Sequence, residues 1–325
     1  MSEPAARDRN LSLELVRVTE AAALAAAAHM GSGDHKTADE AAISAAHTLL
    51  HSLSIRGTVC VGEGSKDEAS HLFIGEEVGT GHGPDVEVAI VALEGASIVA
   101  RGGPNAISTV AMVEGGNFLR VPSIYMNKIA VGPDVPKGTV DLDKSAAENL
   151  AALAEAKDVP ISDLVVCMLD RPRHKVLLEE VRAAGARVRL ILGGDVSGAI
   201  ATALPESGMD MYMGIGAAPQ GVIAAAGLRG FGGHMQGRLY ARQESDRQEA
   251  SDLGIEDFNQ VYDETEMATG NITFAATGVT YGTLLQGIRR QKGTASSHSL
   301  VVRSLTGTHR YIEAHHDFTR RAPIS

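Results

Sequence analysis

The sequence has no tryptophan, six phenylalanines, six tyrosines and no excess of basic residues. Nucleic-acid surfaces need clustered Lys and Arg, and single-strand binders also need aromatic stacking platforms. The 325 residues carry 40 acidic against 29 basic side chains, so the formal net charge is −11. We therefore expect no nucleic-acid partner and a core built from aliphatic residues.

Long apolar runs are also missing. The longest uncharged apolar stretch, residues 21–30, ends at Gly31 and is shorter than the roughly 18 residues that a membrane span needs. Residues 1–10 carry charges of both signs and no apolar stretch, which argues against a secretory signal. We expect a cytoplasmic protein without membrane contact, in which Cys60 and Cys167 are buried free thiols within strand-like runs.

The first half of the chain is patterned as helices followed by strands. Residues 11–30 predict a long helix that Gly31 ends, and a second helix is expected from Thr37, where Thr37 and Glu40 have the spacing of a capping box. Strand-like runs follow at residues 57–62, 86–93 and 107–113. The pattern predicts two helices packed on a mostly antiparallel or mixed sheet.

The second half alternates strand-like and helical runs. Strands are expected at residues 164–169, 187–192 and 209–214, each before a helical run, and Pro219 suits the start of the last of these helices. This rhythm predicts a parallel βαβ layer. Residues 243–269 are interpreted as a surface helix plus loop, and the runs at 272–278, 299–305 and 308–316 as strands that return to close that layer.

The predicted organisation has three parts. Residues 1–10 form a flexible N-terminal arm, residues 11–160 a helix-plus-sheet subdomain, and residues 161–325 a parallel-sheet α/β subdomain.

Four acidic segments lie at expected element ends beside glycine. They are residues 31–40, 61–68, 92–97 and 193–198. Carboxylates from separate loops can converge on Mg²⁺ or Mn²⁺, which prefer hard oxygen ligands. Each segment on its own is equally well a solvated turn.

The order and spacing of several motifs resemble the class II fructose-1,6-bisphosphatase family from about Arg9 to His316. The motifs are GSGDHKTADE, VGEGSKDEAS, LEGA, YMNK, RPRH, GGDV, GIGAAPQG and NITFAATGVTYGTLLQG. The resemblance implies the layered α/β/α/β/α sandwich of the fructose-bisphosphatase and inositol-phosphatase type, with two subdomains and the site between them. It also implies a phosphorylated-sugar substrate, a divalent metal, and a homodimer or homotetramer.

The resemblance implies metal ligands at Asp34, Glu63 and Glu94, but other family positions are replaced. Where the family has Asp-Pro-Ile-Glu-Gly-Thr, this chain has Val91, Ala92 and Ala96 in place of the Asp, Pro and Thr. In the family's Gly-Gly-Ala-Pro-Glu-Gly motif, Ala217 and Gln220 replace a glycine and the metal carboxylate. We therefore expect Mg²⁺ or Mn²⁺ to be held weakly, at a vestigial site, or no metal to bind.

The sugar and phosphate positions of the family are better preserved. The resemblance assigns substrate binding to Gly95, Tyr125, Lys128, Arg171, Arg173, His174 and Asp195. Arginine offers phosphate a bidentate fork and lysine a point charge. Alternatively, the two arginines are a solvated helix start and Asp195 is a helix N-cap.

Three residues are candidates for acid-base chemistry: Glu94, His35 and His234. Both histidines replace other residues in family motifs, and a neutral imidazole near pH 7 suits isomerisation, epimerisation or elimination. Surface or packing histidines are the alternative. His309, Glu313, His315 and His316 alternate along a strand-like run, which is more typical of a solvated face than of a metal site.

These observations favour an enzyme that acts on a phosphorylated sugar. Its scaffold is that of a class II fructose-1,6-bisphosphatase whose metal-dependent phosphomonoester hydrolysis is weakened or replaced by other sugar-phosphate chemistry. Two alternatives stay open: a fructose-1,6-bisphosphatase with an impaired metal site, and a catalytically silent sugar-phosphate-binding protein.

Overall fold

The computed structural model describes residues 11–320, so the predicted arm at residues 1–10 lies outside the described residues. Its helices are α1 (Leu11–Ala27), α2 (His35–His51), α3 (Ala96–Arg101), α4 (Ala146–Lys157), α5 (Lys175–Ala183), α6 (Asp195–Ala201), α7 (Ala218–Phe231), α8 (Glu244–Asp252) and α9 (Glu264–Met267). Within residues 11–320, no helix has the length and apolar character that a bilayer crossing requires.

The strands form two sheets. The first has the order β12-β13-β11-β4-β3-β1-β2, with β14 paired to β13, and the second has the order β10-β9-β5-β8-β6-β7. The strands of the first sheet are β1 (Arg56–Val61), β2 (Glu77–Val78), β3 (Asp85–Glu94), β4 (Ile107–Glu114), β11 (Asn271–Gly278), β12 (Arg289–Gln291), β13 (Thr294–Arg303) and β14 (Thr308–Asp317). Those of the second are β5 (Tyr125–Val131), β6 (Val165–Leu169), β7 (Arg187–Ile191), β8 (Met211–Ala217), β9 (His234–Tyr240) and β10 (Tyr262–Asp263).

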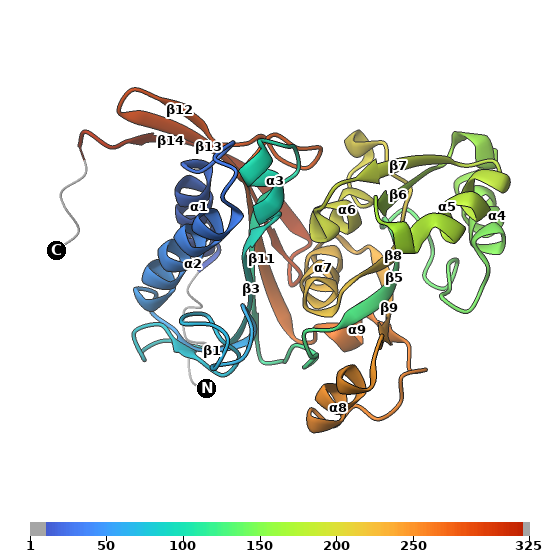
Figure 1. Cartoon of the computed structure of the whole chain (residues 1–325), viewed down its shortest axis with the longest axis horizontal. Coiled ribbons are helices and arrows are strands. Elements are labelled where there is room, and N and C mark those ends of the chain that lie inside the picture. The colour runs from blue at the N-terminus through green and yellow to red at the C-terminus, as the bar shows by residue number, and fades with distance from the viewer. Residues whose placement is uncertain (1–10, 321–325) are drawn as a thin grey trace, which may run out of the picture.

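Helices and sheets alternate as layers (Figure 1). Helices α1 and α2 cover one face of the first sheet, α6 and α7 lie between the two sheets, and α4 and α5 cover the outer face of the second sheet. This confirms the predicted α/β fold with its layered arrangement. The central layer matters for function because it brings the ends of strands from both sheets together.

The assignment of strands to sheets differs from the expectation in two places. The strands after residue 270 do not close the C-terminal layer, because β11 pairs antiparallel with β4 of the first sheet. Conversely, β5 pairs with β8 and β9 in the second sheet. The two sheets therefore do not divide the chain at residue 160, and the second sheet is mixed, with parallel pairing only among β6, β7 and β8.

The start of α2 also differs from the expectation. Asp34 is the N-cap, and its carboxylate accepts hydrogen bonds from the Thr37 amide at 3.1 Å and the Thr37 hydroxyl at 2.6 Å. The capping box predicted for Thr37 and Glu40 is wrong, because Thr37 already lies inside the helix. An N-cap side chain of this kind satisfies amide groups that the helix leaves free.

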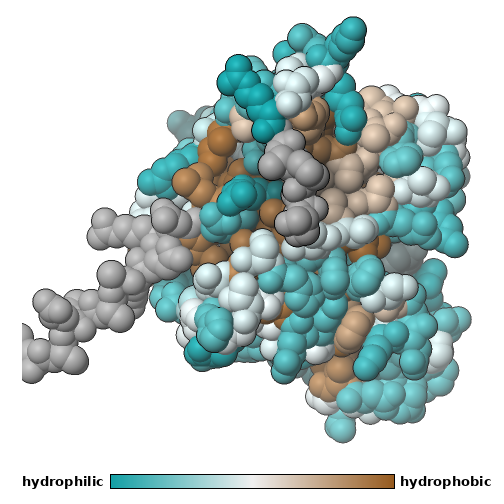
Figure 2. Space-filling model, turned by 90° about the vertical axis from the view of Figure 1, so that its left-hand side faces the viewer, coloured by the Kyte–Doolittle hydropathy of each residue, from teal (hydrophilic) through white to brown (hydrophobic). Residues whose placement is uncertain are grey.

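Apolar side chains reach the surface on the side that carries α1 and α2, where hydrophobic and hydrophilic residues alternate (Figure 2). A groove of about 850 Å³ runs between the two helices and is lined by Ala21, Ala25, Ala41 and Ala45 among others. A homodimer or homotetramer stays a prediction.

Candidate functional site

A pocket of about 300 Å³ lies at the strand ends between the two sheets. The sequence-predicted residues in its lining are Glu94, Gly95, Tyr125, Arg171, Arg173 and Asp195, and the replaced positions Ala217 and Gln220 line it as well. Gly95 has φ 97°, in the left-handed region that favours glycine, and is the N-cap of α3. The structure thus gathers residues from distant parts of the sequence into one cavity.

Backbone carbonyl groups hold the two arginines at the pocket. Arg171 donates from Nη1 to the Asp170 carbonyl and from Nη2 to the Leu192 carbonyl, both at 2.7 Å. Arg173 donates from Nε and Nη2 to the Ile215 carbonyl at 2.9 and 2.7 Å. Because a guanidinium has five N–H donors, Arg173 keeps the other three for a ligand. Two fixed cations at one rim suit a phosphate group.

The Tyr125 ring contacts two guanidinium groups. Arg173 lies 4.7 Å from the ring centroid and Arg242 lies 4.4 Å from it. Such cation–π contacts fix the direction of a charged side chain. Arg242 was missed by the sequence analysis because it follows β9 outside any motif considered there, and only the pairing of β9 with β5 brings it to Tyr125.

His174 has a positioning role in the structure and does not line the pocket. Its ring is buried, with Nδ1 2.7 Å from the Leu169 carbonyl, and Nε2 accepts the Ile215 amide at 2.8 Å. Burial, as the main cause, lowers the pKa of His174. Because Ile215 also accepts from Arg173, the neutral imidazole fixes the strand end that orients this arginine.

Lys128, to which the resemblance assigns substrate binding, is likewise outside the pocket lining. Its ammonium group is buried, forms an ion pair with Asp195 and donates to the Ala217 carbonyl at 2.9 Å. The Tyr212 hydroxyl donates to the other Asp195 oxygen, and burial raises the pKa of Tyr212 well above its ordinary value. A Cβ on Gly216 would lie 1.9 Å from an Asp195 oxygen, so the backbone passes close to this pair.

Glu94 is a buried carboxylate between the sheets. One oxygen accepts the Val196 amide at 2.8 Å and the other lies 3.4 Å from the Ser197 amide. Burial is the main cause that raises the pKa of Glu94 to about 7, and the nearby Asp195 adds to it. Glu94 can therefore exchange a proton near neutral pH.

Glu63 and Asp39 form a second acidic pair, which is not part of the pocket lining. Glu63 accepts the Ala92 amide at 2.9 Å. Burial raises its pKa to about 7, with a further contribution from the charge of Asp39. Burial also raises the pKa of Asp39, which the sequence analysis did not single out.

Asp34, which the sequence analysis placed at the metal, is exposed instead. The Thr37 hydroxyl and amide lower its pKa, and its carboxylate is used as the N-cap. Asp39 lies on the second turn of α2, next to the fully buried Ala38. This position identifies Asp39 as a candidate only when the start of α2 at residue 35 is known. The exposed His35 lies on the first turn, near Asp39.

The replaced family positions carry neutral groups, and at Val91 and Gln220 these stand in place of family carboxylates. Val91 is buried and pairs with Thr109 across the β3–β4 ladder. Ala92 supplies its amide to Glu63, and Ala96 is the first residue of α3. The Oε1 atom of Gln220 is buried and accepts no hydrogen bond from any residue in the described range 11–320.

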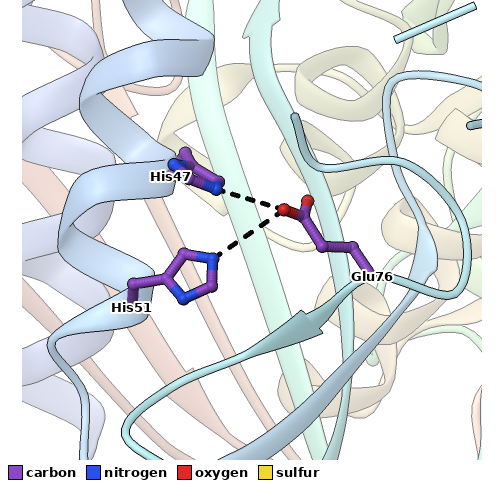
Figure 3. Close-up of side chains that lie close together, drawn as sticks. All are labelled: His47, His51 and Glu76. Atoms are coloured by element: carbon purple, nitrogen blue, oxygen red, sulfur yellow. Dashed lines mark hydrogen bonds and ion pairs between the residues drawn. The ribbon is translucent and has the colours of Figure 1, made fainter. Parts of the chain in front are cut away.

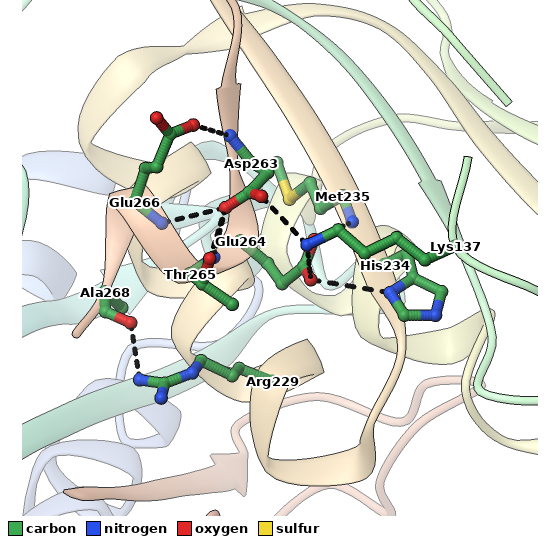
Figure 4. Close-up of polar contacts among 9 residues, drawn as sticks. All are labelled: Lys137, Arg229, His234, Met235, Asp263, Glu264, Thr265, Glu266 and Ala268. Atoms are coloured by element: carbon green, nitrogen blue, oxygen red, sulfur yellow. Dashed lines mark hydrogen bonds and ion pairs between the residues drawn. The ribbon is translucent and has the colours of Figure 1, made fainter. Parts of the chain in front are cut away.

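His234 does not line the pocket, and its ring is turned toward Glu264 (Figure 4). In the β5–β9 ladder it pairs with Val131, six residues from Tyr125, which corresponds to about 20 Å at the usual rise of a strand. Its Nδ1 lies 3.4 Å from Glu264, which also binds Lys137 at 3.1 Å and accepts the Met235 amide at 3.1 Å. These neighbours hold His234 in a structural polar cluster, so the catalytic role expected for it has no support in the geometry of the pocket.

A divalent metal is implied by the family, and the residues present fit one weakly held cation. Asp39 and Glu63 are two partly buried carboxylates close enough to influence each other. Around the pocket, Glu94 is bonded to amide groups and Asp195 to Lys128. Within residues 11–320, no three carboxylate or imidazole ligand atoms converge at this pocket, so the residues do not fit a cluster of several cations.

Comparisons with known proteins agree with the motif resemblance. Residues 9–316 match the family described as bacterial fructose-1,6-bisphosphatase, glpX-encoded. The chain belongs to the class II fructose-1,6-bisphosphatase family. It is 41% identical to a "D-fructose 1,6-bisphosphatase class 2/sedoheptulose 1,7-bisphosphatase" of Trichodesmium erythraeum, over 96% of this chain and 97% of the relative. It is 40% identical to a protein of the same description from Synechococcus elongatus, with the same coverage.

Proposed function

We propose that this class II fructose-1,6-bisphosphatase family member binds a phosphorylated sugar in the pocket between its sheets, and that its metal-dependent phosphate release is weakened or replaced. One observation carries the second part: the acidic side chains of the pocket are engaged by the protein itself. Glu94 accepts amide groups of Val196 and Ser197, and Asp195 is neutralised by Lys128.

Phosphate recognition rests on Arg171 and Arg173. Both guanidinium groups are fixed by carbonyl oxygens, and that of Arg173 also by the Tyr125 ring, so little side-chain entropy is lost when a ligand binds. The Lys128–Asp195 pair is neutral as a unit, so Asp195 does not offset the charges of Arg171 and Arg173. A phosphate dianion is the ligand class that this charge distribution favours.

Proton transfer is assigned to Glu94. With a pKa of about 7 it is present in both protonation states at neutral pH, and it lies in the pocket lining beside Asp195. A hydroxyl of a bound sugar next to this carboxylate can give up or receive a proton. The two amide groups that Glu94 accepts keep its carboxylate oriented.

A second candidate is an ordinary sugar bisphosphatase. It is favoured by the descriptions of the Trichodesmium and Synechococcus relatives, which are 41% and 40% identical to this chain over nearly its whole length. A cation held by Asp39 and Glu63 would supply charge neutralisation to such an activity. The replacements at Val91, Ala96 and Gln220 argue that this activity is slower here.

The test is a panel of sugar mono- and bisphosphates, measured for binding and for products in parallel. Thermal stabilisation of the protein reports binding, and orthophosphate release with Mn²⁺ or with EDTA reports metal-dependent hydrolysis. The proposal expects stabilisation by at least one sugar phosphate, with slow release or with a rearranged product. Rapid release that EDTA abolishes supports the second candidate, and no stabilisation by any sugar phosphate overturns both.

A further inference from the structure

Histidine and glutamate side chains converge at the C-terminal end of α2, apart from the pocket. His47 and His51 are four residues apart on the helix, so their rings project from the same face. Figure 3 shows both rings turned toward Glu76, which precedes β2. The Nε2 atoms of His47 and His51 lie 3.1 and 3.8 Å from Glu76 Oε1.

These distances suit a small metal ion. Zinc binds imidazole nitrogen and carboxylate oxygen at about 2.0–2.1 Å, so ligand atoms at the corners of a tetrahedron stand about 3.3 Å apart. The three ligand atoms of His47, His51 and Glu76 all lie within 4.8 Å of one another. We propose that His47, His51 and Glu76 form a binding site for a zinc-class transition metal.

A third imidazole adjoins the site, and a backbone amide holds the carboxylate. The His71 ring lies 4.1 Å from the His47 ring, centroid to centroid, on the segment that leads to Glu76. The second oxygen of Glu76 accepts the Leu72 amide, which fixes the direction of the first. Such a hydrogen bond to a ligating carboxylate is the usual support of a metal site. His71 adjoins the site, but its ring nitrogens are not among the three ligand atoms that lie close together.

The donor set selects the class of metal. Two imidazoles with one carboxylate favour Zn²⁺, Co²⁺, Ni²⁺ or Cu²⁺, whereas Mg²⁺ and Mn²⁺ prefer oxygen ligands. His51 keeps 39% of its side chain exposed, which leaves a path for the ion.

The site joins two elements that also carry the acidic pair. The Leu72 carbonyl accepts the Glu63 amide at 2.9 Å, and α2 carries both Asp39 and His47. A metal bound at His47, His51 and Glu76 would therefore fasten the segment 63–76 to α2 and stabilise the folded chain. It would do so without contacting the lining of the pocket.

The test uses the full chain without an affinity tag, stripped of metal by a chelator and then titrated with Co²⁺ and with Zn²⁺. We expect one equivalent of Co²⁺ to give the visible absorption of a tetrahedral site, and one equivalent of Zn²⁺ to displace it. Excess Mg²⁺ should not displace the Co²⁺. The His47→Gln/His51→Gln variant should bind Zn²⁺ at least about 100-fold more weakly, since two ligands are gone. His82→Gln, which removes an exposed histidine elsewhere, is the matched control.

Two further measurements distinguish zinc bound at His47, His51 and Glu76 from zinc bound elsewhere on the chain. Glu63→Gln should bind Zn²⁺ as the unchanged protein does, because the acidic pair of Asp39 and Glu63 supplies no ligand to this site. Nitrogen-15 spectra of the imidazoles in the unchanged protein should move for His47 and His51 on addition of Zn²⁺, and this needs no variant that must fold. Unmoved resonances, or equal zinc affinity in the double variant and the His82→Gln control, would overturn the proposal.

Discussion

Lys128 and Asp195 form an ion pair in the interior of the protein, with only 1% and 9% of their side chains exposed. The pair links β5 to the start of α6, directly behind the pocket, and Tyr212 donates to the same carboxylate. A buried pair contributes little net stability, but removing one partner leaves an uncompensated charge. Lys128 and Asp195, to which the family resemblance assigns substrate binding, therefore neutralise each other in this structure.

Lys128→Met should destabilise the fold by about 3–5 kcal/mol, because Asp195 then stays buried without its cation. Urea unfolding followed by circular dichroism measures the loss. Lys128→Met/Asp195→Asn should recover most of it, because the amide carries no charge and can still accept from Tyr212. If Lys128→Met lowers the free energy of unfolding by less than about 1 kcal/mol, the pair is not buried as described.

Stability should fall as the pH rises from about 4.5 to about 7. The ordinary pKa of a glutamate side chain is 4.5, and the pKa of Glu94 in the folded protein is about 7. In this window the folded chain holds a proton that the unfolded chain has released, so the contribution of Glu94 is complete below pH 4.5 and is lost on approaching pH 7. This contribution of Glu94 to the free energy of unfolding is roughly 3 kcal/mol.

Glu94→Gln isolates that contribution. Urea unfolding at pH 5, 6, 7 and 8 should give a shallower decline for the variant than for the unchanged protein. Glu63, whose pKa is also raised to about 7, should account for part of the decline that remains. Identical pH profiles for the two proteins would contradict the raised pKa of Glu94.

Arg173→Ala should weaken sugar-phosphate binding by about 1.5–3 kcal/mol, since a charged hydrogen-bond donor to the phosphate is lost. Isothermal titration with fructose 6-phosphate and fructose 1,6-bisphosphate measures the change. Arg182→Ala, an exposed position on α5, is the matched control and should bind normally. Equal affinity of the two variants would remove Arg173 from the site.

Restoring charge at the replaced positions should raise phosphate release. We expect Val91→Asp/Ala96→Thr/Gln220→Glu to increase Mn²⁺-dependent release from fructose 1,6-bisphosphate at least about 10-fold, because it returns two carboxylates and a hydroxyl to the site. Ala92 stays unchanged, since a proline there would remove the amide that Glu63 accepts. Val91→Asn/Ala96→Thr has similar shape without the charges and should not gain activity. A restored variant that folds and gains nothing would count against the account of lost ligands.

Local patterns in the sequence predicted much of the fold. Helices α1 and α2, the strands β1, β3 and β4, and the pair Arg171 and Arg173 lie where apolar spacing and motif order placed them. Such patterns could not predict which strands pair with those after residue 270. An apolar run is equally compatible with either sheet, and tertiary contacts decide which sheet it joins.

The differences between the expected and the observed surroundings of the site residues have a similar origin. Asp34 and Asp39 are five residues apart, and whether a carboxylate caps a helix or lies on its buried side depends on where the helix begins. His234 lies at the opposite end of β5 from Tyr125, a relationship that only the strand register reveals. The position of each side chain, rather than its presence in a motif, determined which residues reached the pocket.

The most direct test of the central claim compares this protein with its Synechococcus elongatus relative under identical conditions. Orthophosphate release from fructose 1,6-bisphosphate and sedoheptulose 1,7-bisphosphate is measured with saturating Mn²⁺, alongside binding of the same sugars. We predict that this protein binds a sugar phosphate but releases orthophosphate at least about 100-fold more slowly than the relative, as expected when several ligands of a metal centre are replaced. Equal release rates, abolished in both proteins by EDTA, would contradict the account.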